Sequence, residues 1–190
     1  MEVFEAIKKR RSIRKYKPDK IPEKDLKEIL EAARLAPSAH NWQYWKFILV
    51  RDPDKIKLLA EITQPFLSEA ACAIVALAKG DPSVNLIRAR AKEKKFTLDM
   101  AYSYLINLFK RDVMIAIQNM VIAAQGLGYG TCWIGTMVEE EVKKLLGIPL
   151  EWNVVDLISV GVPDESPEPK SRKPFSEIFF DEEYGKSLIF

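Results

Sequence analysis

Apolar residues recur every three or four positions in four stretches of the chain, which is the spacing of an amphipathic helix. These stretches are residues 2–9, 22–36, 53–62 and 139–146. A fifth stretch, residues 113–127, is apolar nearly all round and predicts a helix that is buried on most sides. Asp112 directly precedes this stretch and is expected to open that helix.

Four shorter runs predict β-strands, at residues 46–50, 71–78, 131–136 and 154–162. The second of these is almost unbroken in its apolar character, as expected for a strand that is covered on both faces. Strands separated by helices predict an α/β or α+β architecture with a mixed sheet. The 190 residues suffice for one domain with a sizeable core, and we therefore expect a single domain over residues 1–190.

Two parts of the chain carry a weaker pattern. Residues 80–111 are first basic and then aromatic, which predicts helical pieces without fixing how they are arranged. The aromatic side chains there are equally consistent with simple packing under a solvated helix face. Residues 164–190 are polar and rich in proline as far as Pro174, and then contain the apolar groups Ile178-Phe179-Phe180 and Leu188-Ile189-Phe190. Such a tail needs a surface to cover, on its own domain or on a partner subunit.

Charge is unevenly distributed. The chain has a net charge of only +2, yet residues 1–20 contain eight basic and three acidic residues. A nucleic-acid-binding protein usually carries a larger excess spread over a face, so the local excess favours a small anionic ligand. Residues 1–20 also lack the apolar core of a secretion signal, and no apolar run is long enough to cross a bilayer, so we expect a cytoplasmic protein.

Few residues are available for metal or thiol chemistry. His40 is the only histidine, which argues against a histidine-based metal centre and leaves acid–base chemistry to other groups. Cys72 and Cys132 lie far apart, each inside an apolar run and without a paired spacing. We expect both to be buried free thiols.

The strongest candidate for ligand chemistry is the run Arg10-Arg11-Ser12-Ile13-Arg14. Guanidinium groups match phosphate oxygens with two parallel hydrogen bonds, and a hydroxyl adds another donor, so the run suits a phosphomonoester. A basic surface cluster is the alternative interpretation. Lys170-Ser171-Arg172-Lys173-Pro174 is a second cationic segment, which by itself is typical of a solvated linker.

Two further segments suit a flat polar ligand. In residues 36–45, small residues precede Asn41 and Gln43, whose amides offer the donors and acceptors that a flavin ring edge or ribityl chain requires. Residues 126–135 contain four glycines but follow a helix and enter a strand, which is the wrong order for a dinucleotide-binding loop. We instead expect this segment to present exposed backbone N–H groups, around Trp133–Gly135, to a ring nitrogen or carbonyl of the ligand. The alternative for residues 36–45 is a helix end followed by a loop with packing tryptophans. The alternative for residues 126–135 is a glycine that ends a helix before a core strand.

Together these segments resemble the nitroreductase-like family of FMN-dependent oxidoreductases, over essentially the whole chain. The resemblance rests on the order and spacing of six features: the run at 10–14, Ala-Pro-Ser-Ala-x-Asn-x-Gln at 36–43, Trp-Lys-Phe at 45–47, Asp112, Gly-x-Gly-Thr-Cys-Trp-Ile-Gly at 128–135, and Arg172-Lys173-Pro174. The chain departs from the family at Tyr44, where a proline is usual.

The resemblance implies an α+β sandwich with a mixed, mainly antiparallel sheet surrounded by helices, as an intertwined homodimer with FMN at the interface. Residues 80–111 would cover the substrate, and residues 164–190 would reach the partner subunit. By this resemblance the FMN site comprises Arg10, Arg11, Ser12, Arg14, Pro37, Ser38, Ala39, Asn41, Gln43, Trp133, Ile134, Gly135 and Arg172, with Lys170 in support. Arg10, Ser12 and Arg172 would hold the phosphate, and Arg14 would lie at the flavin N1/O2 edge.

The implied activity is transfer of two electrons from NADH or NADPH through flavin N5 to a small acceptor such as a nitroaromatic or a quinone, with ping-pong kinetics. No catalytic side chain and no metal are required, because the flavin carries the chemistry and Arg14 tunes its charge. The alternatives are a flavoprotein that stores FMN without turnover, and a member specialised for dehalogenation, enone reduction or flavin cleavage.

Overall fold

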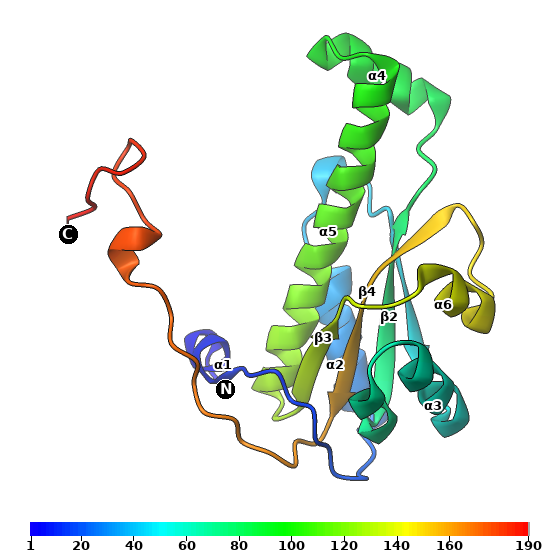
Figure 1. Cartoon of the computed structure of the whole chain (residues 1–190), viewed down its shortest axis with the longest axis vertical. Helices are drawn as coiled ribbons and strands as arrows, with labels where there is room; N and C mark the ends of the chain where they lie inside the picture. Colours follow the sequence, from blue (N-terminus) through cyan, green and yellow to red (C-terminus); the bar gives the residue numbers. More distant parts are fainter. Residues whose placement is uncertain (190) are drawn as a thin grey trace.

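A four-stranded antiparallel sheet forms the centre of the molecule, with helices on both of its faces (Figure 1). The computed structural model describes residues 1–189. The strands follow the order β1-β2-β4-β3, and every neighbouring pair is antiparallel. Among the described residues, the one parallel pairing is an isolated bridge between Ser12 and Thr131. The strands are β1 (Trp45–Val50), β2 (Cys72–Lys79), β3 (Gly130–Ile134) and β4 (Trp152–Gly161).

The apolar pattern explains which strands lie in the middle. In β2 every residue from Cys72 to Ala78 is buried, as expected for the unbroken apolar run. In β4 the residues from Asp156 to Gly161 are buried as well. Cys72 and Cys132 are both buried and free, which confirms that prediction.

One layer of helices consists of α2 (Glu23–Arg34) and α5 (Leu98–Gly126), whose apolar sides pack with Cys72, Ile74 and Ile158 of the sheet. The short α1 (Val3–Lys9) also contacts α5. The opposite layer contains α3 (Pro53–Ile62), η2 (Pro65–Glu69) and α6 (Glu139–Leu146). The α+β architecture with a mainly antiparallel sheet is thereby confirmed.

The structure corrects the prediction that Asp112 opens a helix. Residues 80–111 contain α4 (Val84–Lys94) and the first half of α5, which begins at Leu98 after Thr97 caps its first turn (Thr97 Oγ1 to Met100 N, 3.2 Å). Asp112 therefore lies in the middle of α5. Ala101, Leu105 and Phe109 are fully buried at helical spacing, but the polar and aromatic residues between them obscure this pattern in the sequence. Strand β3 ends at Ile134, two residues before the predicted end.

The C-terminal segment leaves the sheet after β4, runs past α1 and then extends away from the rest of the molecule (Figure 1). It contains one helical turn, η3 (Phe175–Glu177), and Ile178 and Phe179 are exposed. Phe190, the last residue of the predicted apolar end, lies outside the described residues. Within residues 1–189, no helix has the length and apolarity needed to cross a membrane.

Candidate functional site

The basic N-terminal run forms an extended segment beside β3. Helix α1 ends at Lys9, and after Arg10 the chain pairs with β3 through the bridge at Ser12 and a hydrogen bond from Ile13 N to Thr131 O (2.9 Å). Ile13 points inward and packs against Gly130, where an added Cβ would lie 2.8 Å from the Ile13 side chain. Gly130 thus allows the basic segment to approach the sheet closely.

Arg10, Ser12 and Arg14 alternate along this segment and converge near Cys132 of β3. Burial raises the pKa of the Cys132 thiol. The charge of Arg14 opposes that rise most strongly, followed by a hydrogen bond from Ser12 and the charge of Arg10. These three predicted cofactor residues form a small basic cluster at the edge of the sheet, and the Glu165 carboxylate, which raises the pKa of the same thiol, lies beside them.

Arg11 points elsewhere. Its Nη1 donates hydrogen bonds to the backbone oxygens of Lys8 and Arg10, both at 2.7 Å, and so caps the end of α1. Its Nε is buried and has no hydrogen-bond partner among the described residues. Arg11 also lines a hollow of about 370 Å³ between the end of α1, the end of α5 and residues 163–169.

The predicted cationic residues of the C-terminal segment do not join this cluster through any contact in the described chain. Lys170 and Arg172 are exposed, and neither forms a hydrogen bond or an ion pair there. Glu165, closer to β4, does reach the basic segment, because its Oε1 accepts a hydrogen bond from Arg14 N at 2.5 Å.

The loop after α2 has an unusual backbone. His40, Asn41 and Gln43 all have positive φ angles, between 51° and 56°, which is costly for residues other than glycine. Hydrogen bonds within the loop support this path, from Gln43 N to Ser38 Oγ (3.1 Å) and from Gln43 Nε2 to Asn41 Oδ1 (3.2 Å). The exposed side chains of Pro37, Asn41 and Gln43 leave this loop available to a ligand.

Asp112 fixes this loop to α5, because its Oδ2 accepts a hydrogen bond from Ala39 N at 3.0 Å. The hollow beside Arg11 lies at the C-terminal end of the helix, next to Gln125. Thirteen residues of α-helix span about 20 Å, so a single chain keeps the 36–43 loop well away from the end of α1. The two predicted parts of the cofactor site are separate within one copy of the chain.

At the end of β3, Trp133 is partly buried against the α2–α5 layer, Ile134 is buried on the opposite face, and Gly135 is exposed. A Cβ at Gly135 would lie 2.9 Å from Asp156 Oδ1, so the backbone there approaches the carboxylate as closely as only glycine permits. Asp156 is 9% exposed, and burial raises the pKa of its carboxyl to about 6. We did not predict a role for Asp156; the available signal was a carboxylate inside an apolar strand.

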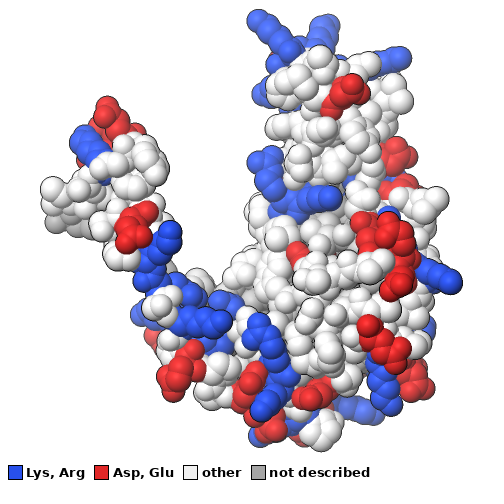
Figure 2. All heavy atoms as spheres, in the orientation of Figure 1, with Lys and Arg blue, Asp and Glu red and all other residues white. Residues whose placement is uncertain are grey.

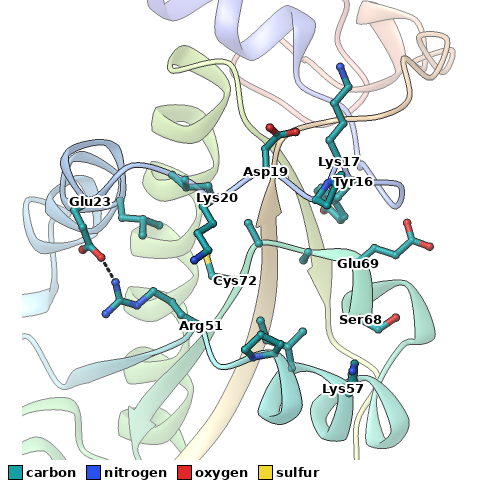
Figure 3. Close-up of a pocket in the computed structure, with 17 residues that line it drawn as sticks. Tyr16, Lys17, Asp19, Lys20, Glu23, Arg51, Lys57, Ser68, Glu69 and Cys72 are labelled. Carbon is teal, nitrogen blue, oxygen red and sulfur yellow. Dashed lines mark hydrogen bonds and ion pairs between the residues drawn. The ribbon is translucent and has the colours of Figure 1, made fainter.

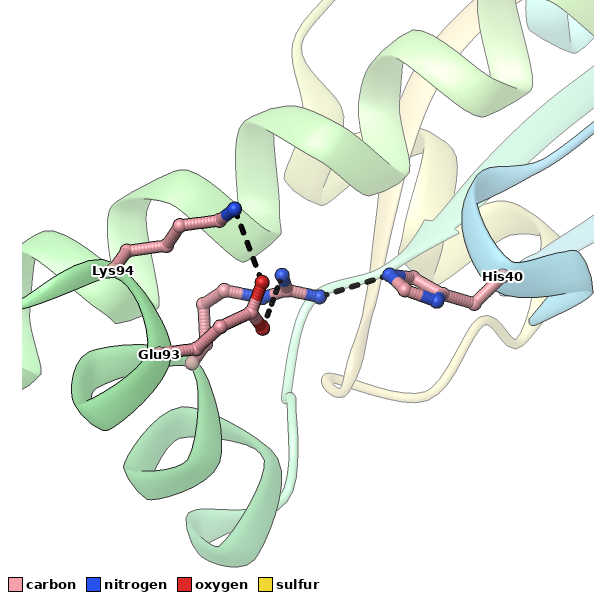
Figure 4. A network of polar contacts seen from close by, with 4 residues as sticks. His40, Glu93 and Lys94 are labelled. Atoms are coloured by element: carbon pink, nitrogen blue, oxygen red, sulfur yellow. Dashed lines mark hydrogen bonds and ion pairs between the residues drawn. The ribbon is translucent and has the colours of Figure 1, made fainter.

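Arg90 is a second charged residue that sequence reasoning missed. It is only 6% exposed and joins α4 to the 36–43 loop, with Nη1 bonded to Glu93 (2.7 Å) and Nη2 to His40 Nε2 (3.1 Å) (Figure 4). Its guanidinium also lies 5.7 Å from the ring centroids of Trp42 and Tyr104. The predicted substrate cover is therefore attached to the predicted cofactor loop.

A hollow of about 580 Å³ between the start of α2, the start of α3 and residues 16–21 contains none of the predicted cofactor residues (Figure 3). Lys20 and Arg51 project into it, and Arg51 is paired with Glu23. On the face seen in Figure 2, Lys and Arg gather instead where the C-terminal segment leaves the body and at the free end of α4 and α5. No group of three or more His, Cys, Asp or Glu side chains in residues 1–189 is arranged to hold a metal ion.

Comparison with known proteins identifies the family to which this chain belongs. The model of the Nitroreductase family matches residues 7–162, and the chain belongs to that family. A relative from Archaeoglobus fulgidus with the provisional name NADH dehydrogenase/NAD(P)H nitroreductase is 36% identical over 170 residues, which cover 86% of this chain and 87% of the relative. An NADH dehydrogenase from Thermus thermophilus is 30% identical, with coverage of 91% and 92%.

Solved structures agree with this assignment. An FMN-dependent nitroreductase from Clostridium difficile superposes with a TM-score of 0.73 at 29% identity, covering 94% of this chain and 98% of that one. A nitroreductase family protein from Streptococcus pneumoniae gives a TM-score of 0.77 at 27% identity, with coverage of 95% and 100%. The expected nitroreductase fold is thereby confirmed.

Proposed function

We propose that this protein is an FMN-dependent NAD(P)H oxidoreductase of the nitroreductase type. It takes two electrons from NADH or NADPH and passes them to a small electron-poor acceptor, such as a nitroaromatic or a quinone. The observation that carries the proposal is the placement of Arg10, Ser12 and Arg14 along the segment beside β3, which is followed by Gly135 with its exposed backbone. Relatives named NAD(P)H nitroreductase and NADPH-dependent oxidoreductase support the same activity.

Arg10 and Ser12 of this cluster fit an FMN phosphate. A guanidinium group and a hydroxyl provide the charge and the donors that a phosphomonoester dianion requires. Neither the Arg10 nor the Arg14 side chain forms an ion pair within the described residues. The Arg14 guanidinium lies 5.8 Å from the centroid of the Phe66 ring, a contact that leaves its charge without a counter-ion. Arg172 would close the phosphate site from the C-terminal segment, with Lys170 in support, whereas Arg11 would help chiefly by fixing the end of α1.

The other residues are assigned to the flavin ring, at the end of the cofactor away from the phosphate. Arg14 would lie near the flavin N1/O2 edge, and the backbone of Trp133, Ile134 and Gly135 would line the N5/O4 side. FMN supplies the two-electron chemistry when bound, while these residues orient it and set its charge environment. Because the nicotinamide and the acceptor would use one site in turn, we expect ping-pong kinetics.

We propose a homodimer in which each FMN site uses both subunits. Within one chain the 36–43 loop is bonded to Asp112 in the middle of α5, whereas the basic segment lines, through Arg11 and Ile13, a hollow at the C-terminal end of that helix. The loop of a second copy is therefore needed to complete the site. Pro37, Ser38 and Ala39 would then cover the ring, with Asn41 and Gln43 nearby. Residues 164–189 would extend over the partner, which explains the exposed Ile178 and Phe179.

The acceptor class is suggested by the surroundings of the predicted site. Helix α4 and the start of α5 combine basic residues with aromatic ones such as Tyr102 and Tyr104. This composition favours flat, electron-poor or anionic aromatic compounds. Dehalogenation, enone reduction and flavin cleavage are reactions to assay in parallel.

The decisive experiment is the visible spectrum of the purified protein, followed by an anaerobic titration with NADH and with NADPH. A yellow protein that bleaches rapidly, and regains its colour when menadione or nitrofurazone is added, is the expected result. Yellow protein that neither nucleotide bleaches would identify a flavin-storage protein instead. A colourless preparation that takes up no FMN on reconstitution would overturn the proposal.

A further inference from the structure

A shallow hollow of about 660 Å³ lies between β4 and the first half of α5. Its wall on α5 carries Tyr104, Lys110 and Arg111, and its wall on β4 carries Asp156. The α5 residues follow helical spacing and form one side of the helix. The hollow is adjacent to Gly135, the residue to which we assign the N5/O4 side of the flavin.

Asp156 is an unusual residue for the middle of a sheet. It faces Ala76 of β2 just beside a register shift, where a bulge changes the direction of neighbouring side chains. The carboxylate is nine-tenths buried and forms no hydrogen bond or ion pair in the described chain. Lys110 and Arg111 line the same hollow but do not pair with it.

An unpaired buried carboxylate is costly in its ionised form, because burial removes hydration that nothing replaces. The raised pKa, about 6, is a consequence of this burial. Apolar residues fill the neighbouring positions of β4, so packing alone does not require a carboxyl group here. A carboxyl that is partly protonated near neutral pH and open to a ligand hollow is suited to transfer a proton.

We infer that Asp156 donates a proton to the acceptor during its reduction. Conversion of a quinone to a hydroquinone consumes two electrons and two protons. A hydride equivalent, originating from NAD(P)H, brings both electrons and one proton. The second proton comes from Asp156, whose O–H bond breaks as the new O–H bond of the acceptor forms, and the carboxylate then recovers a proton from water. This inference rests on the proposed function and adds a catalytic residue to it.

The test compares two acceptors in the oxidative half-reaction of FMN-loaded protein, measured by stopped flow after anaerobic reduction. Menadione requires protons, whereas ferricyanide accepts single electrons and takes up none. For Asp156→Asn we expect menadione reduction at pH 6 to slow about 10- to 100-fold, and ferricyanide reduction to change less than twofold. The wild-type menadione rate falls as the pH rises above about 6, because the acid form disappears, and the variant shows no such decline.

A measurement without turnover checks the ionisation itself. The folded state holds the proton of Asp156 more tightly than the unfolded state, so wild-type stability contributed by this group is lost as the pH rises through about 6. The melting temperature of Asp156→Asn should therefore exceed that of the wild type at pH 8 and approach it at pH 4. Asp81→Asn is the matched control, because Asp81 is exposed in the loop before α4 and forms no ion pair in the described chain; this variant should match the wild type throughout.

Each outcome has a distinct meaning. Equal slowing of both acceptors would show a structural role and overturn the inference. Wild-type rates with both acceptors in a protein that NADH or NADPH still bleaches would overturn the role of Asp156 and leave the proposed function intact. A protein that does not hold FMN would overturn both.

Discussion

Adjacent arginines of the basic segment have different surroundings because the backbone there is extended. Successive side chains of an extended segment point to opposite sides. Arg10 and Arg14 lie with Ser12 near Cys132, whereas Arg11 turns back to the carbonyl oxygens of α1. The composition of the run predicts an anion site, but only the pairing with β3 separates its ligand-facing residues from the helix cap.

Arg14→Ala should make bound FMN harder to reduce. Reduced flavin carries negative charge at N1, and a nearby cation stabilises that charge. Two unit charges at about 4 Å interact with about 4 kcal/mol at an effective dielectric constant of 20, but Arg14 is exposed and the net effect is smaller. We expect the midpoint potential to fall by about 20 to 40 mV, measured by dye-equilibrated titration.

Lys15→Ala is the control for this measurement, because Lys15 is an equally exposed neighbouring cation on the same segment. Its midpoint potential should stay within the error of the wild-type value. If the midpoint potential of Arg14→Ala equals that of the wild type, Arg14 does not stabilise the charge of the reduced flavin.

Helix α4 depends on its attachment to the rest of the protein. It has a weakly amphipathic sequence, and among its residues only Arg90 and Ala91 are buried. Arg90 connects it to His40, in the loop that we assign to the flavin. Ser83 caps α4 and Thr97 caps α5, because their side chains accept hydrogen bonds from Leu86 N and Met100 N. The attachment through a buried arginine is not readable from the sequence, because the partners are distant in the chain.

Arg90→Ala should loosen α4 while leaving the sheet intact. The substitution removes charged hydrogen bonds and the packing of the guanidinium against Trp42 and Tyr104. A loss of about 1.4 kcal/mol in local stability corresponds to a tenfold rise in amide exchange. Hydrogen exchange monitored by mass spectrometry should show this rise in residues 84–94 and in the 36–43 loop.

The matched control is Arg88→Ala, which removes an exposed arginine from the same helix. It should leave exchange in α4 within about twofold of the wild type. Unchanged exchange in Arg90→Ala would contradict the attachment described above, and a uniform rise across β2 and β4 would indicate general destabilisation rather than release of one element.

At the scale of the whole molecule, the exposed apolar residues argue for a second copy. Val3, Phe4 and Ile7 of α1 are exposed, as are Ile178 and Phe179 of the C-terminal segment. Apolar side chains concentrated on a terminal helix and an extended tail mark a surface for association. This agrees with a cofactor site divided between two chains.

Replacing the apolar residues of the tail should weaken the dimer. For Ile178→Ser/Phe179→Ser we expect the dissociation constant of the dimer to rise at least tenfold, because each buried apolar side chain contributes about 1.5 to 3 kcal/mol. Analytical ultracentrifugation over a concentration series measures this, and FMN content should fall together with the dimer fraction.

Leu150→Ser provides the control, since Leu150 is 89% exposed but belongs to the turn before β4 rather than to the tail. Its association behaviour should equal that of the wild type. A wild-type protein that sediments as a monomer at all concentrations would contradict the dimer itself.

The sequence by itself determined the elements whose signals are local. Periodic apolar residues predict α2, α3 and α6, the unbroken run predicts β2, and the glycines and prolines mark several ends. The motifs at residues 10–14, 36–43 and 128–135, in that order, also indicate the nitroreductase family. These features depend on neighbours within a few residues, which is the range over which helix and strand preferences act.

Tertiary structure alone decided the features that depend on distant contacts. The start of α5 at Leu98, the turn of Arg11 away from Arg10 and Arg14, and the hydrogen bond from Ala39 to Asp112 arise from packing between elements far apart in the chain. The burial of Asp156 beside Gly135 is of the same kind. The residues next to a carboxylate in a strand do not show whether it is buried, because its solvation depends on the elements that the fold places against it.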